Sequence, residues 1–380
     1  MIDGAMRLFD TARRAVVPFE PGPTVSMYVC GLTPYDSTHL GHAATYVTYD
    51  VLHRRLLDRG HDVRMVRNIT DVDDDILRVA RARGVHFLDL AAAEIRTFDD
   101  DMAALGNLEP WSEPRATWAI ADIRGFIGAA VDRGNAYVVD GAVYFDVSSA
   151  PGFGTLSHLD PDTMRWFGPQ RGEDPDDPAK RHPLDFVLWK PSAPDEPSWD
   201  SLWGPGRPGW HVECSALALR ELGTTIDLHG GGTDLIYPHH ECELAQSEAV
   251  TGEVFVRHWM HQAMVRYHGE KMSKSRGNLV FVGDLRNNHD PRALRLALLA
   301  HHYRRSWTWA PAVLDEAEAR LACWLGADDD TEQVLLDGVR AALDDDLDTP
   351  SALSQIDRVA DQGGPIGAAA SLLGIDLAGP

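Results

Sequence analysis

Lysine is scarce in this sequence, and its scarcity restricts what the protein can bind. The 380 residues contain the four lysines Lys180, Lys190, Lys271 and Lys274, and acidic residues outnumber Lys and Arg by 58 to 35. The net charge of −23 opposes nonspecific nucleic-acid binding, which depends on a basic surface that displaces counterions. We therefore expect small-molecule substrates and do not expect tRNA as a partner.

A long apolar run is also missing. No stretch approaches the roughly 20 apolar residues that a membrane span needs. The first ten residues carry acids and lack the apolar segment of a signal peptide. We therefore expect a cytoplasmic protein that has no membrane partner and works as a monomer.

Cysteine is rare and widely spaced, at Cys30, Cys214, Cys242 and Cys323. In a cytosolic chain of this length, such cysteines indicate metal ligands or buried thiols before disulfides. A small buried apolar side chain is an adequate interpretation for Cys242 and Cys323. Cys30 and Cys214 lie beside the motifs described below, which favours a chemical role for both.

The first part of the chain has the pattern of a nucleotide-binding fold. Residues 25–30 (VSMYVC) are typical of a buried strand, 41–59 have helical periodicity closed by Gly60, and 62–68 (DVRMVRN) predict a second strand. Strand, helix and strand at this spacing predict a right-handed βαβ unit and hence a parallel sheet.

The rest of the chain first interrupts this pattern and then resumes it. Residues 84–197 mix helices, a hairpin and a Pro-, Gly- and Asp-rich stretch, whereas 210–222 predict a helix and 225–229 a strand followed by a glycine run. From about residue 290 onward every segment predicts helix. The expected divisions are 1–85 for the first half of an α/β nucleotide-binding fold, 86–197 for a connective insertion, 198–285 for the second half, and 286–380 for a helical domain.

The run His39-Leu40-Gly41-His42 lies where a loop enters a helix. The two imidazoles share one helix face, and a helix N-terminus favours phosphate through its free N–H groups and dipole. Histidines at this position can donate to the charge that develops in nucleotidyl transfer. Two surface histidines that cap a helix would give the same pattern, so this run alone leaves both interpretations open.

Half of the lysines fall within the run 270–277 (EKMSKSRG), as Lys271 and Lys274. A cationic, glycine-flanked loop suits transient neutralisation of a pyrophosphate leaving group. The alternative, a solvated charge run, explains poorly why a lysine-poor chain concentrates two lysines here.

Two thiols and an imidazole predict a metal site. Cys30 ends a predicted strand, Cys214 lies on a predicted helix and His239 begins another, so all three belong at the carboxyl edge of the parallel sheet. This set suits zinc with a fourth position left for substrate, and a soft thiolate of cysteine would be preferred over the hydroxyl of serine. Glu243, one turn after His239, either closes the coordination sphere or supports it from outside.

The motifs resemble those of class I aminoacyl-tRNA synthetases, whose paired signature is HLGH-like near the start and KMSKS later. Over the whole chain the resemblance is to the cysteinyl-tRNA synthetase superfamily, through the runs MYVCGLTPY, THLGHAATY, NITDVDD, GWHVECSA, HGGGTDLIYPHHE and GEKMSKSRGNLVFV. Within it the chain is similar to the branch that ligates cysteine to glucosaminyl-inositol in mycothiol biosynthesis, because HLGH is followed by Ala43-Ala44-Thr45-Tyr46 and the acidic tail is short. Residues 170–175 (QRGEDP) are similar to that branch's ERGGDP motif, with Gln170 and Glu173 departing from it.

The resemblance implies a class I synthetase-type fold, one zinc ion, and ATP as substrate together with Mg²⁺. It implies catalytic roles for His39, His42, Lys271 and Lys274, and zinc ligation by Cys30, Cys214 and His239. It also implies a cysteinyl-adenylate pocket made of Cys30, Gly31, Leu32, Thr33, Thr45, Asn68, Ile69, Thr70, Trp210, Gly232, Thr233, Asp234 and Val265.

The sequence leaves three functions open, which differ in the acceptor of the cysteinyl group or in having none. The first is ligation of activated cysteine to the amine of the amino-sugar inositol, with release of AMP and pyrophosphate. A cysteinyl-tRNA synthetase with a minimal C-terminus shares the first half-reaction, and Glu243 matches a fourth zinc ligand of those synthetases. The third is an inactive paralogue that senses zinc or nucleotide, against which the intact HLGH and KMSKS runs argue.

Overall fold

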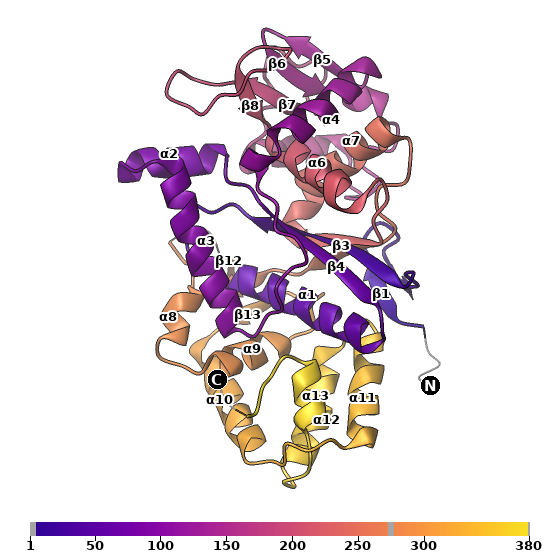
Figure 1. The fold of residues 1–380 in the computed structure, drawn as a ribbon, viewed down its shortest axis with the longest axis vertical. Helices are drawn as coiled ribbons and strands as arrows, with labels where there is room; N and C mark the ends of the chain where they lie inside the picture. The colour runs from indigo at the N-terminus through magenta and orange to yellow at the C-terminus, as the bar shows by residue number, and fades with distance from the viewer. Residues whose placement is uncertain (1–4, 273–276, 379–380) are drawn as a thin grey trace.

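A parallel four-stranded sheet lies at the centre of the structure, a computed structural model that describes residues 5–272 and 277–378, apart from the side chains of 170 and 171 (Figure 1). In spatial order the strands are β10 (Trp259–Gln262), β9 (Leu228–Gly232), β3 (Thr24–Leu32) and β4 (Asp62–Ile69). β3 leads through helix α1 (Leu40–Asp58) to β4, whereas β9 pairs with the opposite edge of β3. The chain therefore adds strands on one side of β3 first and on the other side later, so the strand order reverses between β3 and β9. Ligands of α/β proteins bind at the carboxyl ends of the strands at such a reversal.

The βαβ unit predicted from the sequence is confirmed. Central residues of β3 are buried in succession rather than alternately, as expected for a parallel strand covered on both faces. Helix α1 begins after His39, whose Nδ1 accepts a hydrogen bond from the backbone N–H of Gly41, and it ends before Gly60 at φ 90°. These caps explain why the helix matches the predicted range within one residue.

The glycine run lies inside β9 rather than after a strand at 225–229, as the sequence analysis expected. The reason is steric, because a Cβ at Gly230 would lie 1.9 Å from Oη of Tyr49 and 2.1 Å from the carbonyl oxygen of Met260. Glycine lets α1 and β10 approach β9 closely. The functional loop after this strand is thereby placed close to α1.

A second, antiparallel sheet lies within and just beyond the expected insertion, at the top of Figure 1. Its strands are β5 (Ala136–Val139), β6 (Ala142–Phe145), β7 (Phe186–Pro191) and β8 (Gly206–Pro208). The helices of the region are α2 (Asp74–Arg83), α3 (Phe87–Ala104), α4 (Ile120–Asp132) and α5 (Pro161–Phe167). Strand β8 follows residue 197, so this sheet extends past the range expected for the insertion.

The second half of the nucleotide-binding fold returns to the central sheet. Helix α6 (Trp210–Leu222) precedes β9, and a kinked segment (Ile236–His240) with extended backbone at Tyr237 then leads into α7 (Glu241–Thr251). After β10, the short strands β11 (Val265–Tyr267) and β12 (Glu270–Lys271) form a hairpin, and α8 (Val282–Arg286) follows.

The C-terminal region is mostly helical, with α9 (Pro291–Leu299), α10 (Pro311–Leu325), α11 (Gln333–Asp344), α12 (Thr349–Ala360) and α13 (Gly367–Leu372). The expectation of helix throughout is wrong at β13 (Trp307–Trp309), which pairs in parallel with β11. The sequence Trp-Thr-Trp favours a strand once a partner is available. A hairpin of β1 (Arg7–Asp10) and β2 (Ala15–Pro18) completes the fold.

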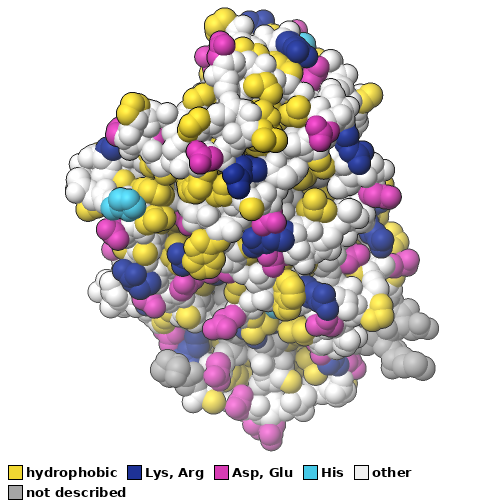
Figure 2. Space-filling view, turned by 45° about the horizontal axis from the view of Figure 1, so that its top comes forward, with side chains coloured by type: hydrophobic (Ala, Val, Ile, Leu, Met, Phe, Trp, Pro, Cys, Tyr) yellow, Lys and Arg dark blue, Asp and Glu magenta, His cyan; other side chains and the backbone are white. Residues whose placement is uncertain are grey.

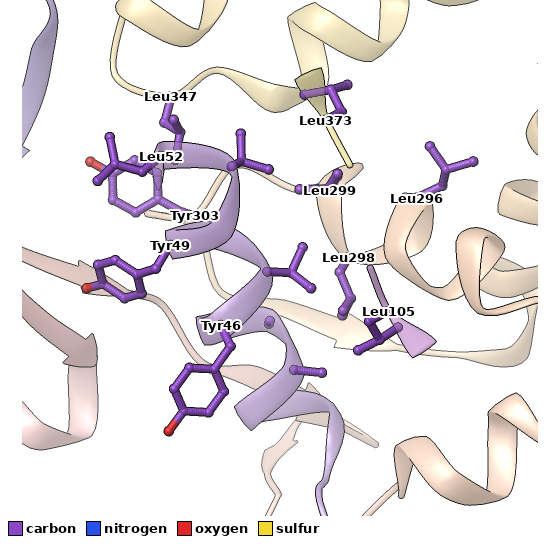
Figure 3. Close-up of a cluster of buried hydrophobic side chains, with 14 of the residues drawn as sticks. Tyr46, Tyr49, Leu52, Leu105, Leu296, Leu298, Leu299, Tyr303, Leu347 and Leu373 are labelled. Atoms are coloured by element: carbon purple, nitrogen blue, oxygen red, sulfur yellow. The ribbon is translucent and has the colours of Figure 1, made fainter. Parts of the chain in front are cut away.

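The helical region packs directly on α1 through a shared apolar core. Figure 3 shows Leu52 of α1 near Tyr303 and Leu347 of the C-terminal region, whereas Tyr46 and Tyr49 point away from the leucines of α9. A buried ion pair between Asp50 of α1 and Arg295 of α9 also joins α1 to the helical region. In the described part of the chain no helix has both the length and the apolar character that crossing a bilayer requires.

Candidate active site

A cavity opens at the carboxyl ends of β3 and β9, where the start of α1 also arrives. Its lining comes from these elements and from the segment that joins β10 to β11: Cys30, Gly31, His39, Gly41, His42, Thr45, Tyr46, Gly232, Asp234, Leu235, Gln262, Ala263, Met264 and Val265. The cavity therefore lies at the reversal of the strand order and beside a helix N-terminus, the position that favours nucleotide phosphates.

His39 and His42 stack at the start of α1, with ring centroids 3.9 Å apart and 26° between the planes. Burial, with His42 and Lys271 nearby, holds the pKa of His39 well below its usual range, and burial likewise lowers the pKa of His42. Both rings are therefore neutral near pH 7. Because Nδ1 of His39 accepts the hydrogen bond from Gly41, its Nε2 carries the hydrogen and can donate.

Lys271 lies on β12 and pairs with Asp234 after β9, with Nζ 3.0 Å from Oδ2. This contact joins the KMSKS segment to the loop that lines the cavity. Lys274, the other lysine predicted to act on phosphate, lies outside the described residues. Among the described residues, this cavity edge therefore combines two neutral imidazoles with the ammonium group of Lys271.

The residues predicted to bind the adenylate fall into three groups. Cys30, Gly31, Thr45, Gly232, Asp234 and Val265 line the cavity described above. Thr33 and Trp210 line a second cavity, which Asp234 also borders. The remaining five, which line neither cavity, are Leu32, Asn68, Ile69, Thr70 and Thr233.

Asn68 has a clear structural role behind the pocket. Its Oδ1 accepts a hydrogen bond from the backbone N–H of Gly31 at 2.8 Å, and its Nδ2 donates to Oγ1 of Thr70. A Cβ at Gly31 would lie 1.7 Å from the carbonyl oxygen of Asn68, so β3 and β4 approach too closely for any other residue. Asn68 thereby supports the backbone next to Cys30.

The predicted metal ligands converge on one point. One ligand atom from each of Cys30, Cys214, His239 and Glu243 lies within 4.8 Å of the others, and all four side chains are buried. Nε2 of His239 is 3.4 Å from Sγ of Cys214 and 3.1 Å from Oε1 of Glu243, while Sγ of Cys30 is 3.6 Å from Oε1 of Glu243. Residues far apart in the sequence are therefore gathered into one cluster.

Two further histidines border the cluster and were missed by the sequence analysis. Nε2 of His240 lies 3.2 Å from Sγ of Cys30, and Nε2 of His229 lies 3.1 Å from Oε2 of Glu243. With Cys30 and Glu243 they form an overlapping candidate set. The adjacent histidines of the run HGGGTDLIYPHHE were a usable signal, but only the kinked backbone before α7 and the burial of both rings show that both point inward.

The donor chemistry of the cluster fits a divalent metal ion. Burial raises the pKa of Cys30, with Cys214 and Glu243 adding to it, and burial also raises the pKa of Cys214. Two thiols and a carboxylate packed together out of water need a cation to be ionised at the same time. Sulfur and imidazole ligands in a roughly tetrahedral group are typical of zinc.

A second, larger cavity of about 690 Å³ adjoins the first and shares Asp234 and Leu235 with it. It lies between the nucleotide-binding fold and the insertion. Its polar lining combines seven carboxylates with four cations: Asp73, Asp74, Asp75, Glu173, Asp174, Asp177, Asp234, Lys180, Lys190, Arg207 and Lys271. A volume of this size accommodates a small organic substrate.

Comparison with known families identifies related proteins. The family described as "tRNA synthetases class I (C) catalytic domain" matches residues 16–319. An L-cysteine:1D-myo-inositol 2-amino-2-deoxy-alpha-D-glucopyranoside ligase from Thermobispora bispora is 51% identical over 357 residues, which cover 93% of this chain and 89% of the relative. The ligase of the same name from Mycolicibacterium smegmatis is 50% identical over 365 residues, covering 93% and 88%.

Solved structures share the fold at low sequence identity. Methionyl-tRNA synthetase of Mycobacterium tuberculosis, in complex with methionyl-adenylate, has a TM-score of 0.64 at 18% identity over 90% of this chain and 82% of that chain. The LeuRS of Agrobacterium radiobacter K84, in a ternary complex, has a TM-score of 0.62 at 12% identity over 94% and 83%. These similarities establish the fold. They do not identify the substrate, which has to be inferred from the residues of the site.

Proposed function

The chain belongs to the family of L-cysteine:1D-myo-inositol 2-amino-2-deoxy-α-D-glucopyranoside ligases, and we propose that it catalyses the reaction in that name as a step of mycothiol biosynthesis. ATP activates L-cysteine as cysteinyl-adenylate with release of pyrophosphate, and the amine of the amino-sugar then displaces AMP. The class I synthetase-type fold and the ligase class, both expected from the sequence, are confirmed.

One observation carries the proposal: Cys30 belongs both to the nucleotide cavity and to the metal cluster. It lines the cavity together with His39 and His42, and its Sγ lies within 4.8 Å of ligand atoms of Cys214 and His239. A sulfur-selective metal beside a phosphate-binding helix start is what cysteine adenylation requires.

In the first step the carboxylate of cysteine attacks the α-phosphorus of ATP, and pyrophosphate leaves. The neutral rings of His39 and His42 donate hydrogen bonds to phosphate oxygens, which avoids placing a fixed charge beside the metal cluster. Lys271 leaves its ion pair with Asp234 and binds the phosphates instead. There its positive charge stabilises the negative charge of the departing pyrophosphate. Mg²⁺ accompanies the nucleotide in this proposal.

Zinc is the metal that we propose for the cluster; Cys30, Cys214 and His239 would hold it, and Glu243 would be a donor that the sulfur of the substrate displaces to take the fourth position. When bound, it supplies a soft Lewis acid that prefers the sulfur of cysteine to the oxygen of serine. Trp210 stacks on His239 with ring centroids 4.2 Å apart, which limits the orientations of that imidazole.

The amino-sugar inositol is proposed to bind in the 690 Å³ cavity, which meets the nucleotide cavity at Asp234 and Leu235. The excess of carboxylates in its lining favours an ammonium group over the phosphates of an RNA end. Figure 2 shows basic side chains scattered among acidic ones on the face in view, with no continuous basic field for a tRNA there.

The test is to incubate the protein with ATP, cysteine and either the amino-sugar inositol or tRNA, and to identify the cysteinyl product by mass spectrometry. We expect a stable amide of the amino-sugar and stoichiometric AMP. Cysteinylated tRNA without amide would establish the synthetase alternative, which the position of Glu243 in the cluster favours. Zinc or nucleotide binding with no AMP from either acceptor would establish an inactive sensor.

A further inference from the structure

Glu173, a residue of the insertion, is linked to the metal cluster through His211. Its Oε1 lies 3.2 Å from Nε2 of His211, and Nδ1 of His211 lies 2.8 Å from Nδ1 of His239. The other ring nitrogen of His239 points into the cluster, 3.4 Å from Sγ of Cys214. A continuous line of contacts therefore runs from the wall of the larger cavity, which Glu173 lines, to the metal site.

The acceptor oxygen of Glu173 determines where the hydrogens lie along this line. Burial raises the pKa of Glu173, but His211 and Lys180, whose Nζ is 3.1 Å away, outweigh that effect and lower it. An ionised carboxylate only accepts hydrogen bonds, so Nε2 of His211 must carry a hydrogen. When His239 binds a metal through Nε2, its hydrogen lies on Nδ1 and is donated to Nδ1 of His211, whose own hydrogen lies on Nε2 toward Glu173.

This assignment leaves Nε2 of His239 with a lone pair directed at the cluster. Oε1 of Glu243 lies 3.1 Å from the same nitrogen, so a metal ion could take ligand atoms from both residues. Without Glu173, His211 could present either tautomer, and His239 could place its hydrogen on Nε2 toward Glu243, where it would block the metal.

We propose that Glu173 is a positioning residue that, through His211, holds His239 in the tautomer whose Nε2 binds the metal. The proposal rests on the proposed function, because it takes the cluster to be a zinc site. Such outer hydrogen bonds to ligating histidines raise metal affinity 10- to 100-fold in other sites. Here the carboxylate comes from the insertion, so the wall of the acceptor cavity and the metal site are energetically linked.

The test is the zinc affinity of the full-length protein, measured by competition with a chromophoric chelator. We expect Glu173→Ala to bind zinc about 10- to 100-fold more weakly. Glu173→Gln should stay near wild type, because its amide oxygen accepts the same hydrogen bond. Lys180→Met removes the ion pair of Glu173 but keeps the contact with His211, so it is the matched control and should also bind normally.

A double substitution separates positioning from general damage. His211→Phe should weaken zinc binding as much as Glu173→Ala, and the double variant should bind no more weakly than His211→Phe alone. Equal zinc affinity of wild type and Glu173→Ala would overturn the inference while leaving the proposed function intact. A wild-type protein that binds no zinc would instead overturn the metal site on which both depend.

Discussion

Lys271 and Asp234 form an ion pair at the point where the two cavities meet, with Nζ 3.0 Å from Oδ2. The pair joins the KMSKS segment to the loop after β9, and both side chains are partly exposed. A nucleotide phosphate competes directly with Asp234 for this ammonium group. The contact holds Lys271 beside the loop that lines both cavities, and we expect a nucleotide phosphate to replace Asp234 as its partner during the reaction.

Replacement of Lys271 by Ala should slow cysteine-dependent ATP–pyrophosphate exchange by roughly 10²- to 10³-fold, the usual effect of removing one preorganised donor to a developing charge. The reduction should appear in kcat more than in the KM for cysteine, because the lysine acts on phosphate. Lys190→Ala is the matched control and should leave exchange unchanged. An equal loss of exchange activity in both variants would mean that Lys271 contributes only to the overall positive charge of the protein.

Replacement of Cys214 by Ala should abolish stoichiometric zinc and reduce exchange to background. Cys242 is also buried on the adjacent helix but lies outside both candidate metal sets, so Cys242→Ala should retain one zinc per chain and near-normal exchange. Metal content by atomic emission and exchange by radiolabelled pyrophosphate provide the readouts. Zinc retained by Cys214→Ala at full stoichiometry would remove that residue from the metal site.

Replacement of Lys190 by Ala should raise the KM for the amino-sugar acceptor about tenfold, equivalent to about 1.4 kcal/mol, because it removes a hydrogen-bond donor to the hydroxyl groups of the acceptor. Lys190 lines the larger cavity and pairs with Asp74, which keeps Arg207 as a second partner in the variant. Steady-state amide formation at saturating ATP and cysteine measures the effect. An unchanged acceptor KM would place the amino-sugar elsewhere.

Replacement of Asp50 by Asn should reduce the free energy of unfolding by about 3–5 kcal/mol, because it leaves buried Arg295 without its charged partner. Burial raises the pKa of Asp50, but Arg295 and Arg54 outweigh it and hold the pKa below its usual range. A lowered carboxyl pKa stabilises the fold above about pH 4 and loses that effect as the pH falls through the folded-state pKa. The stability difference between wild type and variant, from urea unfolding, should therefore narrow below pH 4; a constant difference would contradict the assignment.

The local parts of the site were predictable because their signals are local. A strand, a capped helix start and a second strand are written in consecutive residues, so the positions of Cys30, His39 and His42 followed directly. The meeting of Cys30 with Cys214 and His239 was also predictable, because carboxyl ends of parallel strands share one edge.

The remainder depends on contacts that consecutive residues do not reveal. The contact between Glu173 and His211 joins an irregular loop to a helix 38 residues later, and the larger cavity exists only once the insertion packs on the fold. The inward turn of His240 follows a backbone kink at Tyr237 that periodicity does not predict. Strand β13 forms because β11 offers it an edge, which overrides the helical pattern around it.

Sulfur selection by the metal is the central claim, and cobalt substitution tests it most directly. Co²⁺ replaces zinc in such sites and reports thiolate ligands by absorption in the near ultraviolet. Addition of L-cysteine to the cobalt protein should increase this absorption as a further sulfur binds, and L-serine at the same concentration should leave it unchanged. Identical spectra with cysteine and serine, from a protein that holds one cobalt, would contradict the account.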